Sequence, residues 1–299
     1  MSPGSRPVSG WYRLSVAAIL GCVAQLGCGK KVESLDQPRL GSRVVMRDIA
    51  FRSAALGREM HYRAVLPASA TQHRKLPVLY LLHGNGGSLR DWTNFSDVSQ
   101  FAETGLILVM PEGDNSYYVN AALRPGDRYE DYVIQDLIPD VERRLPASQN
   151  RKLRAIAGVS MGGYGAIKIA WDHPDLFSFA GALSPAVDAP RRRFSVRRIP
   201  QYLAFRSIFG PWGSEARRRS DLFLLARSVD AASAPSLYLT CGEAESLLGP
   251  NRRFVAVLAQ HHLPYEFHAV PGAHDWKQWN QQLPGLFQRL MERLGDSGP

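Results

Sequence analysis

Short and nearly continuous apolar runs recur along this 299-residue chain, and stretches with helical periodicity separate them. Such runs are typical of strands that are buried on both faces of a parallel sheet. Two earlier runs, at 44–51 and 60–66, predict an antiparallel pair of strands ahead of the parallel ones. The later runs predict strands at 77–82, 106–110, 155–157, 179–183, 237–240 and 265–270.

Helical stripes lie between the predicted strands. One spans residues 133–145, where Pro139 is expected to produce a kink, and others occupy 164–171, 254–258 and 286–294. Strands that alternate with helices indicate βαβ units and a mostly parallel sheet flanked by helices. The sequence therefore predicts one α/β domain over residues 43–296, with enough chain for a well-buried core.

Residues 187–228 interrupt this alternation between two predicted strands. Ligands of open α/β folds bind at the carboxyl edge of the sheet, so this segment is predicted to be a small cap insertion over that edge and part of the substrate pocket. Its arginines either select anionic substrates or simply solvate the surface. It holds arginine clusters at 191–193, 197–198 and 217–219, interleaved with Phe194, Tyr202, Phe205, Phe209 and Trp212.

The N-terminal residues 1–28 have the pattern of a signal peptide, with Arg6 and Arg13 before a short apolar stretch. Gly27-Cys28 at its end is similar to a bacterial lipoprotein signal, although Gln25 stands where an aliphatic residue is usual. Gly21-Cys22 is a second candidate, and plain secretion or an uncleaved anchor are alternatives. We therefore expect export to the periplasm or cell envelope or secretion, with lipidated Cys28 as the candidate membrane tether. A polar linker is predicted at 29–42.

Composition narrows the classes of partner and cofactor. A formal net charge of +9 favours acidic partners such as lipid head groups, nucleic acid or anionic substrates, but soluble enzymes without such partners are also basic. No pattern in the sequence is typical of a metal site, a nucleotide-binding loop or a nucleic-acid module. We expect no cofactor, no metal and no nucleic-acid partner. Cys241 would be the one cysteine outside the targeting segment, so no disulfide is expected in the mature domain.

The candidate nucleophile is Ser160 in Gly158-Val159-Ser160-Met161-Gly162, which follows a predicted strand and opens a predicted helix. This is the setting of a nucleophile elbow, a strained turn that exposes the serine oxygen at the sheet edge. Glycines two residues before and after the serine have a steric reason, because a Cβ at either position would crowd the turn.

A glycine-rich loop, His83-Gly84-Asn85-Gly86-Gly87, follows another predicted strand. In α/β-hydrolases one oxyanion donor lies in this loop and the other is the residue after the nucleophile. The predicted donors are therefore the backbone amides of Asn85 and Met161, with Gly86 as the alternative to Asn85.

A serine nucleophile needs a histidine base and an acidic residue. In this fold the acidic residue follows the serine along the chain, and the histidine follows the acidic residue. His274 lies just after the last predicted strand and is the candidate base, whereas His83 is expected to be structural and His261 and His262 to lie at the surface. Glu243 and Glu245 both follow the preceding strand, and strand position alone does not choose between them.

From residue 44 to 294 the chain resembles an esterase family that includes S-formylglutathione hydrolases, short-chain carboxylesterases, feruloyl esterases and mycolyltransferases. The resemblance implies the α/β-hydrolase fold, ester hydrolysis through an acyl-enzyme, and catalytic roles for Ser160 and His274. It also favours Glu245 as the acid, although the family often has Asp there. The segments that carry it are LLHGNGGSLRDW (81–92), VMPEGDNSYYVN (109–120), YEDYVIQDLIPDVE (129–142), GVSMGGYGA (158–166), CGEAESLL (241–248) and VPGAHDWKQW (270–279).

The sequence thus predicts a serine esterase that hydrolyses a carboxylic ester of a small molecule through Ser160, Glu245 and His274. An acyltransferase would use the same residues, and a catalytically silent binding protein would share the fold. Acyl and alcohol specificity and oligomeric state stay open.

Overall fold

The computed structural model describes Met1 and residues 35–295. Contacts divide the chain into residues 1–36 and 37–299. The predicted signal peptide, with Cys22 and Cys28, therefore lies outside the described residues, apart from Met1. Residues 37–41 of the predicted linker have no regular secondary structure, and their backbone is hydrogen-bonded to residues 93–99.

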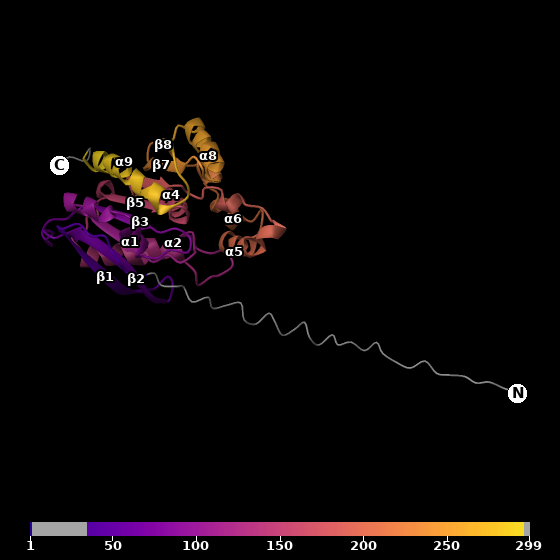
Figure 1. Cartoon of the computed structure of the whole chain (residues 1–299), viewed down its shortest axis with the longest axis horizontal. Helices are drawn as coiled ribbons and strands as arrows, with labels where there is room; N and C mark the ends of the chain where they lie inside the picture. The colour runs from indigo at the N-terminus through magenta and orange to yellow at the C-terminus, as the bar shows by residue number, and fades with distance from the viewer. Residues whose placement is uncertain (2–34, 296–299) are drawn as a thin grey trace. The chain divides into compact units, whose positions relative to one another are not determined.

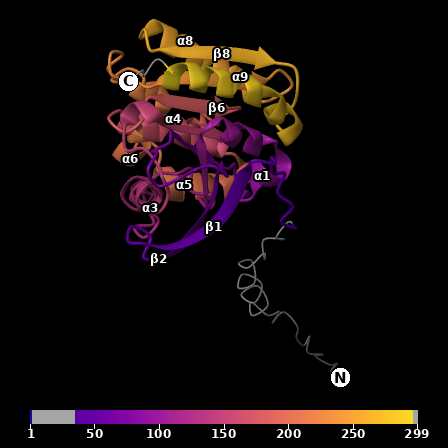
Figure 2. The same cartoon turned by 90° about the vertical axis from the view of Figure 1, so that its left-hand side faces the viewer.

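Among residues 35–295, eight strands form one sheet in the order β1-β2-β4-β3-β5-β6-β7-β8. β1 and β2 pair antiparallel, β2 is also antiparallel to β4, and the pairs from β4 to β8 are parallel. β1 and β8 are the two edges of the sheet (Figures 1 and 2). The predicted strands are confirmed, with bounds β1 Val44–Ser53, β2 Arg58–Pro67, β3 Val78–Leu82, β4 Ile107–Pro111, β5 Arg154–Val159, β6 Phe179–Leu183, β7 Ser236–Gly242 and β8 Tyr265–Val270.

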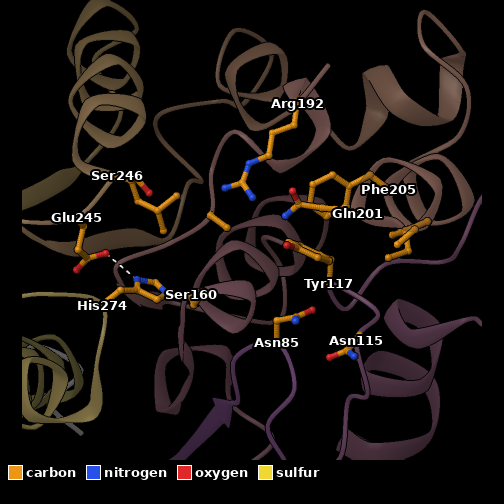
Figure 3. Close-up of a pocket in the computed structure, with 14 residues that line it drawn as sticks. Asn85, Asn115, Tyr117, Ser160, Arg192, Gln201, Phe205, Glu245, Ser246 and His274 are labelled. Carbon is orange, nitrogen blue, oxygen red and sulfur yellow. Dashed lines mark hydrogen bonds and ion pairs between the residues drawn. The ribbon is translucent and has the colours of Figure 1, made fainter. Parts of the chain in front are cut away.

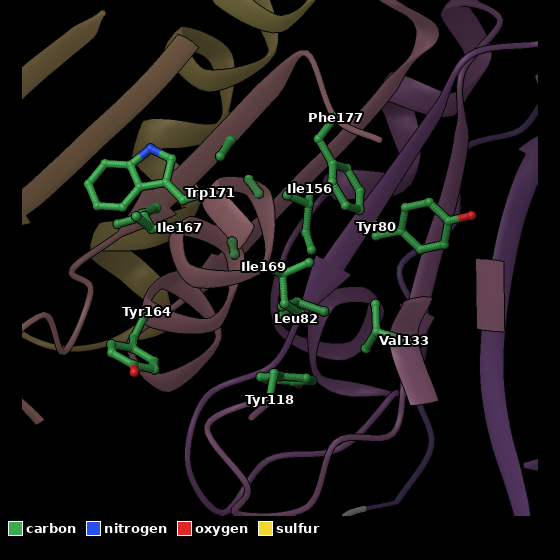
Figure 4. Close-up of a cluster of buried hydrophobic side chains, with 14 of the residues drawn as sticks. Tyr80, Leu82, Tyr118, Val133, Ile156, Tyr164, Ile167, Ile169, Trp171 and Phe177 are labelled. Carbon is green, nitrogen blue, oxygen red and sulfur yellow. The ribbon is translucent and has the colours of Figure 1, made fainter. Parts of the chain in front are cut away.

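The central strands are buried on both faces, as their apolar runs predict. In β3, Val78, Tyr80 and Leu82 belong to one hydrophobic cluster, whereas Leu79 and Leu81 belong to another. Helix α4 (Met161–Asp172) packs in the first cluster together with Val133 of η2 (Tyr132–Leu137) (Figure 4). Residues of α3 (Ile138–Arg144) and α8 (Leu248–Gln260) belong to the same cluster. The second cluster contains residues of α1 (Asp91–Phe95), η1 (Val98–Thr104) and α9 (Trp276–Gly295).

The predicted helix over 133–145 is divided into segments of different pitch. A short α2 (Tyr129–Asp131) leads into the π-helical η2, and α3 follows with Pro139 in its first turn. Proline has no N–H and cannot donate to the carbonyl four residues earlier, so a change of helix type directly before it removes the conflict. The kink expected at Pro139 therefore takes the form of a change from a π-helical to an α-helical pitch just before it.

The predicted insertion between β6 and β7 consists of short helices. They are η4 (Ala189–Arg191), η5 (Val196–Arg198), α5 (Ile199–Phe209), α6 (Glu215–Arg219) and α7 (Leu222–Leu225). Phe205 and Phe209 of α5 pack with Tyr117 and Tyr164, which anchors the insertion to the rest of the domain. No helix in the described part of the chain is long and apolar enough to cross a membrane.

Candidate active site

Ser160 lies at the turn between β5 and α4 with φ 55° and ψ −111°, a conformation that residues other than glycine rarely adopt. A Cβ on Gly158 would come within 2.3 Å of the carbonyl carbon of Gly162, and a Cβ on Gly162 would come within 2.3 Å of the Leu82 carbonyl oxygen. Glycine is therefore required at both positions, for the steric reason that the sequence suggested. The strained turn places the serine oxygen at the carboxyl edge of the sheet.

A chain of hydrogen bonds joins the three predicted catalytic side chains (Figure 3). The Nε2 atom of His274 lies 2.9 Å from Oγ of Ser160, and its Nδ1 atom lies 2.7 Å from Oε2 of Glu245. The serine, the acid and the histidine come from the loops after β5, β7 and β8. This is the order and geometry in which an imidazole takes a proton from a serine hydroxyl.

Glu245 is held as a buried carboxylate, with its side chain 1% exposed. The Ser184 hydroxyl and the Gly242 N–H donate to its Oε1 at 2.5 and 2.8 Å, while Oε2 faces His274. Burial alone would raise the pKa of Glu245, but the hydrogen bonds from His274, Ser184 and Gly242 lower it below its usual value. The carboxylate is therefore ionised where it faces the imidazole.

Glu243, the alternative acid, lies at the surface of the same turn. It is exposed, and its backbone N–H donates to the Val270 carbonyl. The geometry therefore singles out Glu245 of the two candidates.

Asn85 lies in the loop after β3 and lines the same cavities as Ser160. The N–H of Gly86, the alternative donor, is already occupied by Oδ1 of Asn115 at 2.6 Å. In the described residues the backbone N–H groups of Asn85 and Met161 have no such acceptor. These two amides thus stay available for an oxyanion, whereas Gly86 fixes the shape of the loop.

His83 has the structural role that the sequence predicted. It is fully buried, and its Nε2 accepts a hydrogen bond from the Gly113 N–H at 2.9 Å. The ring proton must then lie on Nδ1, which donates to the Gly84 carbonyl at 2.8 Å. A neutral imidazole therefore ties the oxyanion loop to the loop after β4. His261 and His262 follow the end of α8, away from these contacts.

Two cavities meet at Ser160 and share Asn85, Ser160 and His274. The larger, of about 550 Å³, opens toward the cap insertion and is lined there by Arg192, Gln201, Ala204, Phe205 and Ile208 (Figure 3). The smaller, of about 480 Å³, is lined by Asp91, Asp275, Trp276 and Trp279. The predicted contribution of residues 187–228 to the pocket is therefore present in the structure.

The model of the Putative esterase family matches residues 53–290. The chain belongs to this family. It is 25% identical to the acetyl esterase of Caldicellulosiruptor saccharolyticus over 272 residues, which cover 85% of this chain and 100% of that relative.

Two solved structures from Staphylococcus aureus share the fold of this esterase. The fluorophosphonate-binding serine hydrolase F is 26% identical with a TM-score of 0.72, covering 84% of this chain and 99% of that one. The S-formylglutathione hydrolase is 25% identical with a TM-score of 0.70, covering 85% of this chain and 100% of the other. The chain is an α/β-hydrolase and a serine-type carboxylic ester hydrolase.

Several arginines of the cap insertion form hydrogen bonds and ion pairs within the insertion itself. Arg191 binds Asp221, and buried Arg217 donates to the carbonyls of Pro190, Gly210 and Arg192. Arg192 reaches the larger cavity, but Asp188 balances its charge at 2.9 Å. This pairing weakens the expectation that the arginines select anionic substrates.

Sequence reasoning missed two residues that contact Glu245 and His274. Ser184, directly after β6, donates to Glu245 and accepts a hydrogen bond from Nε1 of Trp279 at 3.0 Å. The ring of Trp279 also packs edge-on against His274 with centroids 5.0 Å apart. A polar residue at the carboxyl end of a buried strand was the available signal for Ser184, since such positions face the site in this fold.

We expect Ser184→Ala to lower kcat/KM by about tenfold, because it removes a hydrogen bond to the carboxylate that orients His274. The acid limb of the pH profile should also shift upward, since the lost donor helps to keep the pKa of Glu245 low. Ser178→Ala is the matched control. Ser178 is a buried serine just before the other end of β6, and its hydroxyl donates to backbone carbonyls. Ser178→Ala should cost stability and leave the pH profile unchanged. An identical pH profile in both variants would contradict a positioning role for Ser184.

Proposed function

We propose that Ser160 is the nucleophile, His274 the general base and acid, Glu245 the residue that orients His274, and the Asn85 and Met161 amides the oxyanion donors. The observation that carries the proposal is the continuous hydrogen-bond chain from Ser160 through His274 to a buried, ionised Glu245. A histidine that contacts only a serine, or only a carboxylate, occurs in many proteins. The full chain at a strained strand-to-helix turn is the arrangement that acyl transfer to serine requires.

The reaction follows from these positions. Oγ of Ser160 forms a bond to the ester carbonyl carbon while its proton passes to Nε2 of His274. The tetrahedral oxyanion accepts hydrogen bonds from the two amides, and the carbon–oxygen bond to the alcohol then breaks as His274 returns the proton to the leaving oxygen. Water attacks the acyl-enzyme by the same steps. His274 takes a proton from the water, the acid leaves, and Ser160 recovers its proton.

The substrates are expected to be esters with short acyl groups such as acetyl, a class suggested by the name of the acetyl esterase that matches over its full length. A series of p-nitrophenyl esters with increasing acyl length tests this. The highest kcat/KM should fall at the shortest members, and the rate should decline as the chain lengthens. A maximum at long acyl chains, with little turnover of the acetate, would overturn the choice of substrate but not the triad.

Export and lipidation at Cys28 are also proposed, on the pattern of residues 1–28. Cells that express the full chain should incorporate labelled palmitate into the protein, and Cys28→Ser should abolish the label. Cys22→Ser is the matched control and should leave it unchanged. Incorporation that survives Cys28→Ser would exclude that residue, and purely cytoplasmic fractionation would exclude export.

A further inference from the structure

Large apolar side chains are exposed together on the cap insertion. Phe194, Val196, Ile199, Leu203 and Trp212 are 58%, 73%, 44%, 55% and 54% exposed. Exposed apolar residues scattered singly are ordinary on soluble proteins, whereas a gathering of them marks an interaction surface. All five fall within residues 194–212, so they are gathered in the sequence as well as exposed.

Contacts link several of these side chains or their immediate neighbours. Ile199 and Leu203 are one turn apart on α5, and the neighbouring Tyr202 packs against Phe194 with ring centroids 5.2 Å apart. The opposite side of the same helix buries Phe205, Ile208 and Phe209 in the hydrolase body. Trp212 joins the surface through Arg193, whose guanidinium lies 5.3 Å from the indole. Helix α5 therefore carries apolar side chains on two sides, and no element within residues 35–295 covers Ile199 and Leu203.

Four arginines accompany this surface, and each is exposed. They are Arg193, Arg197, Arg198 and Arg206. Unlike the arginines that hold the cap together, none of the four has a carboxylate partner in the described part of the chain. The sequence from 189 to 214 contains no Asp or Glu. The four arginines and the five apolar residues are together called the cap face below.

The cap face adjoins the larger cavity. Gln201, Ala204 and Phe205, which line that cavity, alternate along α5 with the exposed Ile199, Leu203 and Arg206. Figure 1 shows α5 and α6 projecting from the rest of the domain. Ile199, Leu203 and Arg206 of the cap face belong to α5. A partner seated there would lie beside the entrance to the nucleophile.

We propose that the cap face binds an anionic lipid surface and brings the entrance of the active site to the bilayer. Unpaired arginines are attracted to anionic head groups, and the apolar side chains beside them can enter the boundary with the acyl chains. A nucleic acid would satisfy the arginines but would leave Val196, Ile199 and Leu203 in water. The mixture of charge and exposed apolar area therefore favours lipid as the partner.

Co-sedimentation of the full chain with vesicles tests the proposal. The wild-type protein should bind vesicles of equal parts phosphatidylglycerol and phosphatidylcholine, and bind pure phosphatidylcholine much more weakly. Arg197→Glu with Arg198→Glu should weaken binding to anionic vesicles by about tenfold or more, and Leu203→Ser should also weaken it. Raising the salt from about 0.1 M to about 1 M should release the protein, because screening shortens the reach of surface charges.

Two matched controls lie outside the cap insertion. Arg74→Glu with Lys75→Glu makes the same charge change before the amino end of β3, and Met291→Ser removes an exposed apolar side chain from α9. Both should bind vesicles like the wild type. All variants should hydrolyse soluble p-nitrophenyl acetate normally, which separates a failed membrane proposal from a failed assignment of the triad.

Hydrogen–deuterium exchange measures the protection of the cap face itself. It therefore tests the proposal even if another segment also binds the vesicle. Anionic vesicles should slow exchange in residues 194–212. Unchanged exchange in that stretch would overturn the proposal, as would absent vesicle binding by the wild type. Tight binding to duplex DNA that is insensitive to Leu203→Ser, together with weak vesicle binding, would show a polyanion surface and also overturn it.

Discussion

Ser160→Ala should abolish turnover of p-nitrophenyl acetate while leaving the protein folded. The hydroxyl contacts His274 and serves no packing role, so its loss removes the bond-forming atom without opening a cavity. Losses of about a million-fold in kcat are typical when a serine nucleophile is removed. The free energy of unfolding should stay the same or rise slightly, because a residue placed for chemistry is rarely optimal for stability.

Ser246→Ala is the control for this variant. Ser246 is an exposed serine that also lines the larger cavity. Its loss should change kcat by little. Turnover by Ser160→Ala close to that of the wild type would show that another residue attacks the ester.

Glu245→Gln should lower kcat by about ten-thousand-fold, because an amide keeps the shape of the side chain but disfavours the working tautomer of the imidazole. The carboxylate is buried and lies 2.7 Å from Nδ1 of His274, so no water can take over its role without rearrangement. Turnover at saturating substrate is the measurement. The thermal midpoint should also fall, since Ser184 and Gly242 would lose an ionised acceptor.

Glu243→Gln is the matched control two residues away. Its side chain is exposed, so kcat should remain within about twofold of the wild type. A large loss of kcat in Glu243→Gln, with a nearly normal kcat in Glu245→Gln, would assign the acid to Glu243 instead. Normal activity in both variants would mean that the acid comes from elsewhere in the chain.

The fold was predictable because its strands carry a strong local signal. Leu79 and Leu81 face one layer of helices while Tyr80 and Leu82 face the other, and this double burial produces the apolar run. The first half of α9 was missed for the opposite reason. Residues 276–285 are mostly polar, and Pro284 lies near the middle of the whole helix. Trp279 packs against His274, and Trp276 packs against Trp279.

The three residues of the proposed triad could be selected from the sequence, whereas the residues that contact them could not. Ser160 and His274 stand in short patterns that strand order places at one sheet edge. Ser184 takes a positive φ and reaches Glu245 through a contact across 61 positions of sequence, which no local pattern reports. The loop after β4 likewise holds Asp114, Tyr117 and Tyr118 at positive φ, a conformation that the tertiary structure imposes.

The most direct test of the account is to trap the covalent intermediate. The enzyme is mixed with p-nitrophenyl acetate, quenched within the first turnover and digested, and the peptides are mapped by mass spectrometry. In the wild type, an acetyl group should appear on the peptide that contains Ser160, and fragmentation should place it on the Ser160 side chain. The Ser160→Ala variant should carry no acetyl group. Rapid release of p-nitrophenol with the acetyl group on another residue, or with the same labelling in Ser160→Ala, would contradict the account.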